Sequence, residues 1–464
     1  MQIIGFFKKR NALFLQNDTA AWLRSDPSVQ KALAPAASSC VKNQSFDDLR
    51  IGQSRRICRA ARLTGTGGIM KIAIFTETYL PQTSAVETQV LLLAQSLIRL
   101  GHEVLVVSTD VESEECYLEQ HTLFGPAKPS DTIYGQTGQR TKLNRLKEFI
   151  DDFDPDVIHL FTFCSVGGLG LKYALSHDLP LITTVQSTHD ISEGFYGRGL
   201  RRLLGKRLCQ STYRKALAFS DLVTSPSQKI LRNIRPLCKH RQLTVSPLCI
   251  DTEQLREKAP EGKKTEEIRR RLGITGKTGV LFVGTLGKDN GVDALLDRWA
   301  ALSKSQNKLH LAVVGTGPQF DELKNKANLL GISSRVTFAG EVPREKIPLC
   351  YQVCSAFFSA SESDAMKAAP LEAIVSGLPV ILPKNSACAE LLVDGVNGFA
   401  YDSETDIEKI LRNFASLSPE KEAAMKKLVA RTMGDLTLEE QAKSFLSFYA
   451  LTQKHHYKTA EKLE

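Results

Sequence analysis

The sequence predicts an α/β fold of two doubly wound domains in succession, each a parallel sheet covered by helices on both faces. Short apolar, β-branched runs alternate with helical periods from about residue 70, and the alternation restarts near residue 280. Buried runs separated by helices are typical of βαβ units, which build parallel sheets. At 464 residues and 42% hydrophobic positions, the chain also exceeds what a single core holds.

The first series of elements defines an expected domain over residues 70–251. Gly101 is expected to end its first helix, because glycine accepts the left-handed backbone that follows a helix. The predicted strands are Lys71–Thr76, Glu103–Ser108, Asp156–Phe161, Pro180–Gln186 and Leu222–Ser225, and the first helix is about Glu87–Leu100.

The second series defines an expected domain over residues 279–435, after a charged linker and surface helix over 252–278. A last helix, about Leu436–Thr452, is expected to pack back on the first domain within a segment 436–455. The predicted strands are Val280–Gly284, Leu309–Gly315, Arg335–Gly340, Ala356–Ser359 and Pro379–Pro383. Ligands of such domains bind at the carboxyl ends of the strands, so the site is expected between the two domains.

The net charge of +9 is concentrated in residues 1–69, which hold eleven Lys/Arg against four Asp/Glu. This leader lacks periodicity and is expected to be poorly ordered. It fits an appendage, a targeting segment or a gene start placed too early, and its acidic residues argue against a transit peptide. The rest of the chain is nearly neutral and lacks basic patches interleaved with aromatics, so no nucleic-acid partner is expected.

The ten cysteines are scattered without a C-x-x-C pair or His/Cys ligand spacing, which favours a reducing compartment and no structural zinc. No run approaches the roughly 20 apolar residues of a spanning helix. The expected location is cytoplasmic, with peripheral binding to the inner face of a membrane left open.

A loop and helix in the second domain carry the clearest site pattern. PLEAIVSG predicts a helix that starts near Pro370 and ends at Gly377. Its N-terminus offers unpaired N–H groups and a partial positive charge, which suit a diphosphate. Asp364 and Glu372 bracket the loop DAMKAAPLE, although an isolated acid pair of this kind is more often a loop carboxylate and an exposed helical residue.

The order of motifs resembles glycosyltransferase family 4. Asp364, seven residues and Glu372 are similar to its acidic donor motif, and VGTGPQFDEL and VDGVNGF follow the family order. The turn at Gly315 resembles the family's nucleotide-contacting turn, which makes Gly315 an expected donor-binding residue. The resemblance spans about Met70–Ser447 and implies a GT-B fold: two Rossmann-like domains facing a cleft. It implies that Asp364 binds sugar hydroxyls, that Glu372 binds the nucleotide ribose, and that Ala368 and Ala369 belong to the donor-binding residues. It also places Glu390 near the phosphate loop, where a plain helix residue is an equal interpretation.

One segment lacks the positively charged residues that the family motif has. VGTLGKDNGVD resembles the family's G-R-L-x-x-E-K-G, with Thr285 in place of the arginine and Asn290 in place of the lysine. Such cations stabilise the diphosphate as it leaves, a large catalytic term. Our hypothesis is that Lys288 and Lys367 replace the missing charge.

The first domain is expected to hold the acceptor side of the site, and its motifs differ from those of the family at several positions. TYLPQTSAVETQ resembles the family's glycine-rich loop with Ser84 and Ala85 at the glycine positions, although an ordinary strand-to-helix turn is the alternative. Asp152–Gly199 resembles enzymes that glycosylate diacylglycerol or related lipids, with Gln186 where those enzymes have histidine. Glutamine donates hydrogen bonds but takes no proton near neutral pH. His189 can reach the same space or be merely solvated.

Residues 197–219 predict a basic helix without acids, in which Leu203, Leu204, Leu208 and Leu217 are expected to share an apolar side. A basic amphipathic helix suits docking on an anionic leaflet; the alternative is a core helix with a solvated face. The expected docking residues are Arg201, Arg202, Lys206 and Arg207.

The resemblance implies a retaining hexosyltransferase that needs no metal or other cofactor and takes a nucleotide sugar as co-substrate. Its acceptor is a hydroxyl group, with a membrane lipid as one candidate. The rival interpretation is a GT-B scaffold that binds nucleotide sugar without turnover, which the altered motif positions motivate.

Overall fold

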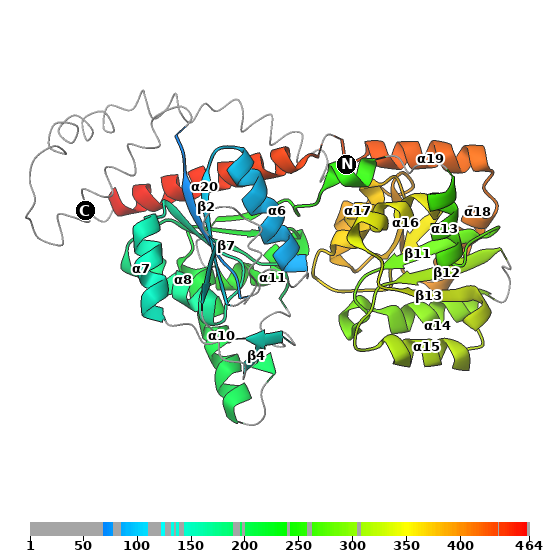
Figure 1. The fold of residues 1–464 in the computed structure, drawn as a ribbon, viewed down its shortest axis with the longest axis horizontal. Helices are drawn as coiled ribbons and strands as arrows, with labels where there is room; N and C mark the ends of the chain where they lie inside the picture. Colours follow the sequence, from blue (N-terminus) through cyan, green and yellow to red (C-terminus); the bar gives the residue numbers. More distant parts are fainter. Residues whose placement is uncertain are drawn as a thin grey trace, which may run out of the picture.

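The computed structural model describes residues 68–77, 85–109, 122–125, 131–133, 136–138, 143–188, 195–196, 200–238, 242–257, 262–303, 308–434 and 436–461. The leader 1–67 lies outside these ranges. Two parallel sheets with helices on both faces form the body of the protein, as the alternation predicts (Figure 1).

The first sheet has seven parallel strands in the order β10-β9-β7-β6-β1-β2-β3. Its strands are β1 (Lys71–Phe75), β2 (Glu103–Thr109), β3 (Thr122–Gly125), β6 (Val157–Leu160), β7 (Leu181–Thr184), β9 (Leu222–Ser225) and β10 (Gln242–Val245). Its helices are α6 (Ala85–Arg99), α7 (Leu143–Phe153), α8 (Ser165–Ser176), α10 (Leu200–Phe219) and α11 (Gln228–Ile234), followed by the 3-10 turn η1 (Arg235–Leu237). A small antiparallel sheet, β5-β4-β8, lies beside them: β4 (Asp131–Ile133), β5 (Gln136–Gly138) and β8 (Phe195–Tyr196).

Strand β1 shows why helices cover both faces. Successive side chains point to opposite faces of a strand. Ala73 and Phe75 therefore pack with α7, α8 and α10, while Ile72 and Ile74 pack with α6 and the last helix.

The second sheet has six parallel strands in the order β13-β12-β11-β14-β15-β16. Its strands are β11 (Thr278–Val283), β12 (Leu309–Val314), β13 (Val336–Gly340), β14 (Ala356–Phe358), β15 (Val380–Pro383) and β16 (Gly398–Tyr401). Its α-helices are α14 (Val292–Ser303), α15 (Phe320–Leu329), α16 (Ile347–Val353), α17 (Ala368–Val375), α18 (Glu404–Ala415) and α19 (Pro419–Arg431). Short 3-10 turns are η2 (Lys288–Asn290), η3 (Ser333–Arg335), η4 (Arg344–Lys346) and η5 (Ala387–Leu391), and the linker holds α12 (Thr252–Arg256) and α13 (Lys263–Arg271).

Helix α20 (Leu438–Glu461) returns to the first sheet and lies alongside α6 (Figure 1). Its residues Ala442, Phe445 and Tyr449 are buried in the same cluster as β1 and α6. Tyr449 is also hydrogen-bonded to the buried ring of His159 on β6, with 2.9 Å between the hydroxyl oxygen and Nδ1.

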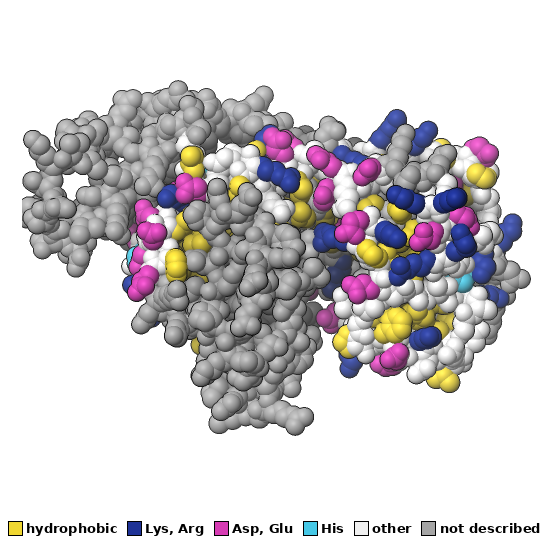
Figure 2. All heavy atoms as spheres, in the orientation of Figure 1, with side chains coloured by type: hydrophobic (Ala, Val, Ile, Leu, Met, Phe, Trp, Pro, Cys, Tyr) yellow, Lys and Arg dark blue, Asp and Glu magenta, His cyan; other side chains and the backbone are white. Residues whose placement is uncertain are grey.

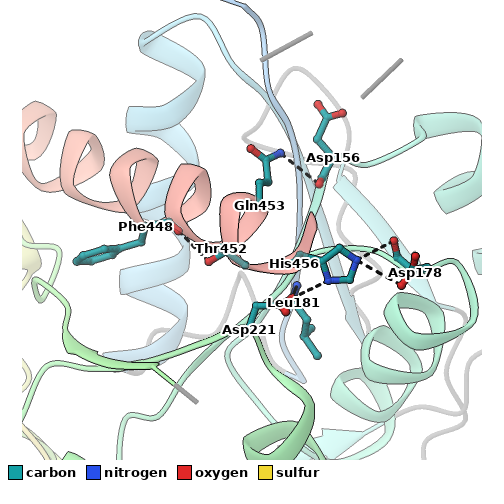
Figure 3. Close-up of polar contacts among 8 residues, drawn as sticks. All are labelled: Asp156, Asp178, Leu181, Asp221, Phe448, Thr452, Gln453 and His456. Carbon is teal, nitrogen blue, oxygen red and sulfur yellow. Dashed lines mark hydrogen bonds and ion pairs between the residues drawn. The ribbon is translucent and has the colours of Figure 1, made fainter. Parts of the chain in front are cut away.

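Further along, α20 binds the amino ends of the strands (Figure 3). Gln453 donates to the carbonyl of Asp156, just before β6. His456 contacts the Asp221 carboxylate at 3.1 Å and the Asp178 carboxylate at 3.4 Å. The last helix is therefore an integral layer of the first sheet's domain.

The scattered cysteines favoured a reducing compartment, but the structure pairs Cys164, before α8, with Cys209 on α10 in a disulfide. The described cysteines of the second sheet's domain, Cys350, Cys354 and Cys388, are buried and free. None of the described helices is long and apolar enough to cross a bilayer.

Candidate donor and acceptor site

The two sheets face each other through the loops that follow their strands. Thr188 comes after β7 and Asp364 after β14, and the Thr188 hydroxyl donates a hydrogen bond to Oδ2 of Asp364. The Ser187 hydroxyl lies 3.3 Å from the other carboxylate oxygen. Asp364 is buried. The acid predicted to bind sugar hydroxyls therefore lies where the carboxyl ends of both sheets meet.

A second carboxylate joins the two domains nearby. Glu390 in η5 accepts hydrogen bonds from the backbone N–H groups of Gln228 at 2.8 Å and Lys229 at 2.7 Å, and its Oε1 lies 3.3 Å from the Ser227 hydroxyl. These are the first free N–H groups of α11, which a carboxylate satisfies well. Glu390 is thus an interdomain cap and not a plain exposed helix residue.

Helix α17 begins at Ala368, so the predicted helix after Pro370 starts two residues earlier. Lys367 precedes it in extended conformation, its backbone N–H donates to the sulfur of Cys388 at 3.2 Å, and no side chain caps the helix. Ala368 and Ala369 pack partly buried at this first turn. An uncapped N-terminus with small side chains leaves N–H groups available to an anion.

Glu372 lies in the middle of α17 and is hydrogen-bonded to a tyrosine of another helix. The Tyr351 hydroxyl of α16 donates to its Oε2 at 2.8 Å. Burial raises the pKa of Glu372, while this hydrogen bond and the charge of Arg344 act in the opposite direction.

The segment that lacks the family's cations forms a compact turn after β11. The side-chain amide of Asn290 donates to the carbonyl oxygen of Thr285 at 2.7 Å. Lys288 begins the 3-10 turn between them. The two uncharged replacements therefore bind each other, and Lys288 contributes the cation of this turn.

Gly315, after β12, packs directly on that turn. Its φ is +130°, and a Cβ there would lie 2.0 Å from the carbonyl oxygen of Gly284. Glycine is required because the two backbones meet without space for a side chain.

On the acceptor side, Gln186 is buried behind β7, and its side-chain nitrogen donates to the Oε1 of Gln89 on α6 at 3.0 Å. Gln89 was not apparent from the sequence, because its partner lies 97 residues away. Ser84 and His189 lie outside the described residues, and of Ala85 only the backbone, the first residue of α6, is described. The structure therefore places Asp364 against Ser187 and Thr188, which directly follow Gln186, and pairs Glu372 with Tyr351 of its own domain.

Glu77, directly after β1, is a further buried carboxylate at this edge. It accepts hydrogen bonds from the N–H groups of Val166 at 2.7 Å and Gly167 at 3.1 Å, at the start of α8. Burial raises its pKa, and these hydrogen bonds lower it. An acid immediately after a buried strand was the sequence signal available for it.

The predicted docking helix is α10. Arg207 is exposed and Lys206 half-buried, whereas only the backbone of Arg201 and Arg202 is described. The expectation of one shared apolar side is wrong for the two described leucines: Leu208 is 61% exposed and Leu217 is fully buried. Nine residues at 100° each place them on opposite faces of a helix.

Among the described residues, no group of three His, Cys, Asp or Glu side chains could hold a metal ion. On the face drawn in Figure 2, Lys and Arg side chains are interspersed with Asp and Glu over the second domain. Charge therefore does not single out one broad basic surface on that face of the domain.

Known proteins match this arrangement over most of its length. Residues 86–254 match the family described as Glycosyltransferase Family 4, and residues 264–430 match Glycosyl transferases group 1. Anabaena HepE, solved in complex with UDP-glucose, covers 82% of this chain and 99% of its own with a TM-score of 0.63 at 19% identity. WaaG, a glycosyltransferase involved in lipopolysaccharide biosynthesis, gives 0.60 at 18% identity, covering 82% of this chain and 99% of its own. With two parallel sheets meeting at their carboxyl ends, the protein is a GT-B glycosyltransferase.

More particularly, the chain belongs to glycosyltransferase family 4 and transfers a sugar from a nucleotide sugar. Alpha-monoglucosyldiacylglycerol synthase of Streptococcus pneumoniae is 27% identical over 73% of this chain and 76% of its own length. GDP-mannose-dependent alpha-mannosyltransferase of Mycolicibacterium smegmatis is 26% identical over 72% of this chain and 84% of its own.

Proposed function

We propose that the protein transfers a hexose from a nucleotide sugar to a hydroxyl group of a membrane lipid, with retention at the anomeric carbon. The observation that carries the proposal is the contact of Thr188 with Asp364, because it brings the donor motif of the second domain against the acceptor half of the first. The names of the relatives support a lipid acceptor, since a diacylglycerol-linked product appears in the first of them.

In this proposal Asp364 binds hydroxyl groups of the transferred sugar and Glu372 binds the ribose. The bond between the anomeric carbon and the diphosphate oxygen breaks, the acceptor oxygen bonds to that carbon on the same face, and its proton leaves with the diphosphate. The N-terminus of α17, with Ala368 and Ala369, and the cation of Lys367 stabilise the departing charge. Lys288 assists from the turn that holds Thr285, and Gly315 keeps that turn close.

On the acceptor side, Gln186 donates a hydrogen bond to substrate in place of a proton-accepting histidine, and its partner Gln89 fixes the orientation of its amide. His189 and the loop with Ser84 and Ala85 complete this half. The arrangement positions a hydroxyl group without requiring a general base on the side chain of residue 186.

We also propose that α10 docks on an anionic membrane through Arg201, Arg202, Lys206 and Arg207, with the exposed Leu208 entering the interface. The chain then acts as a peripheral protein on the inner face of the membrane. The proposed domain boundaries remain 70–251 and 279–435, joined by 252–278 and followed by the helical segment 436–455.

The test is transfer by the purified full chain. Radiolabelled UDP-glucose or GDP-mannose is supplied with vesicles that contain diacylglycerol, and the lipid product is separated and its anomeric configuration read by NMR. We expect a glycolipid of the donor's configuration, and Asp364→Asn is expected to abolish it. Tight nucleotide binding without turnover of either donor would instead support the scaffold function, which the uncharged pair Thr285 and Asn290 motivates.

A further inference from the structure

Tyr351 is the one buried hydroxyl that the described structure hydrogen-bonds to the donor motif from within the second domain. It comes from α16, is 0% exposed, and reaches the carboxylate of Glu372 on α17. The hydrogen bond joins two helices that are adjacent in the same hydrophobic cluster. Packing therefore fixes the tyrosine ring, and the ring fixes one oxygen of the carboxylate.

We infer that Tyr351 is a positioning residue for donor binding: its hydroxyl holds Oε2 of Glu372, so that Oε1 is aimed at a hydroxyl group of the donor's ribose. This inference rests on the proposed role of Glu372. It extends that role by naming the group that orients the carboxylate, which the sequence pattern of the motif does not contain.

In the pair of Tyr351 and Glu372, the tyrosine is always the hydrogen-bond donor and the carboxylate the acceptor. Burial and the neighbouring carboxylate raise the pKa of Tyr351 well above its usual value, so the hydroxyl stays protonated and can only donate to Glu372. An oriented carboxylate with one oxygen already satisfied offers the other to a single incoming hydroxyl. Because the Glu372 carboxylate is oriented before the nucleotide sugar arrives, binding costs less of this side chain's entropy.

Two neighbouring groups lower the pKa of Glu372. Tyr351 of α16 lowers the pKa of Glu372 through the hydrogen bond, and Arg344 of η4 lowers it through its charge, both against burial. Arg344 also donates to the Thr88 hydroxyl of α6 at 3.0 Å, across the domain boundary. Removing the tyrosine hydroxyl is therefore expected to raise the pKa of Glu372 further.

The first experiment needs no ligand. Unfolding midpoints of the full chain are measured between pH 4.5 and 8 for wild type, Tyr351→Phe, Glu372→Gln and the double variant. Because burial raises the pKa of Glu372, its contribution to stability falls as pH rises, and Tyr351→Phe is expected to steepen that fall. In the Glu372→Gln background the same substitution is expected to act equally at every pH.

The second experiment measures binding of UDP and, separately, GDP by calorimetry from pH 5 to 8. We expect Tyr351→Phe to weaken binding of the preferred nucleotide about tenfold at pH 7, with a loss that grows as pH falls. The pH midpoint of binding is expected to move upward, which a merely structural tyrosine would not cause. Tyr401→Phe is the matched control, since Tyr401 is a buried tyrosine of the same domain whose hydroxyl donates to the carbonyl of Ser359.

The outcomes separate this inference from the proposed function. An unshifted pH profile in Tyr351→Phe, or equal losses from Tyr351→Phe and Tyr401→Phe, overturns the positioning role while leaving the donor site in place. Failure of the wild type to bind either nucleotide overturns the donor role of Glu372 and this inference with it. In that case the unfolding experiment still decides whether the pair itself exists.

Discussion

Asn290 donates its side-chain amide to the carbonyl oxygen of Thr285 at 2.7 Å, so the two positions where the motif that this segment resembles has cations bind each other. Neither side chain brings charge to the departing diphosphate. Our hypothesis that Lys367 supplies the missing positive charge is therefore tested first. Lys367 immediately precedes the uncapped helix α17.

Lys367→Ala is expected to lower kcat about 100- to 1,000-fold, the usual effect of losing one group that stabilises developing charge. Steady-state transfer with the preferred donor measures it, and Lys427→Ala, an exposed lysine of α19, is the matched control. Thr285→Arg combined with Asn290→Lys is expected to restore turnover in the Lys367→Ala chain. Unchanged kcat in Lys367→Ala would show that the charge comes from elsewhere.

Glu390→Ala is expected to separate the domains. It removes a carboxylate that caps α11 from the other domain, and hydrogen bonds to a charged group contribute about 1.5–3 kcal/mol. Small-angle scattering should give a larger radius of gyration, and the unfolding midpoint should fall. Glu345→Ala, an exposed acid of η4, is the control, and equal behaviour of the two variants would contradict the interdomain role.

Gly315→Ala is expected to destabilise the chain by about 3 kcal/mol or more, because the new Cβ meets a backbone carbonyl that cannot move freely. Gly331 also has positive φ, +69°, but open space around its Cβ position. Gly331→Ala should therefore cost only about 1 kcal/mol, the strain of the backbone itself. Urea unfolding of both variants measures the clash together with the greater backbone strain at φ +130°, and equal losses would argue against the clash.

His159 predicts a loss of stability in acid. Burial lowers the pKa of this histidine to about 3, below its usual 6.5. The unfolded chain therefore binds the proton first, and the stability present above pH 6.5 is lost as pH falls toward 3. At pH 4.5 the loss is about 3 kcal/mol. His159→Gln should flatten this slope in urea unfolding at several pH values, and an unchanged slope would assign the acid sensitivity to other groups, such as the buried His310.

Charge reversal on α10 tests membrane docking. Lys206→Glu with Arg207→Glu is expected to weaken flotation with anionic liposomes at least tenfold, since each basic residue near such a surface contributes about 1 kcal/mol. Lys263→Glu with Lys264→Glu makes the same charge change on the exposed helix α13 and should have little effect. Binding that ignores salt and both double variants would be inconsistent with docking through α10.

The fold was predictable because most of its strands form apolar, β-branched runs between helical periods. The predicted Leu222–Ser225 has the same bounds as β9, and the return of the last helix to the first domain's sheet is visible in the structure. The missed strands have at most four residues each; they are β3, β4, β5, β8, β10 and β16. Such segments carry too few side chains for an alternation to appear.

The site was predictable only where its residues lie close in sequence. Asp364 and Glu372 share one loop and helix, so their spacing is informative. The contact of Thr188 with Asp364 spans 176 residues and depends on how two domains meet, which no local pattern contains. Tyr351 was also not predictable. Its apolar neighbours in the sequence indicate a core residue and give no sign that its hydroxyl has a polar partner.

Helix α20 has a consequence for the order in which the protein is made. The ribosome completes β1 and α6 long before it reaches Phe445 and Tyr449, which cover them in the finished chain. During synthesis of the whole second domain, that face of the first domain stays without its cover. Exposed apolar surface on a nascent chain favours aggregation and chaperone binding. The first domain therefore emerges first but receives its last helix only at the end of synthesis. A translation stop before residue 438 would leave the apolar face of β1 and α6 without α20.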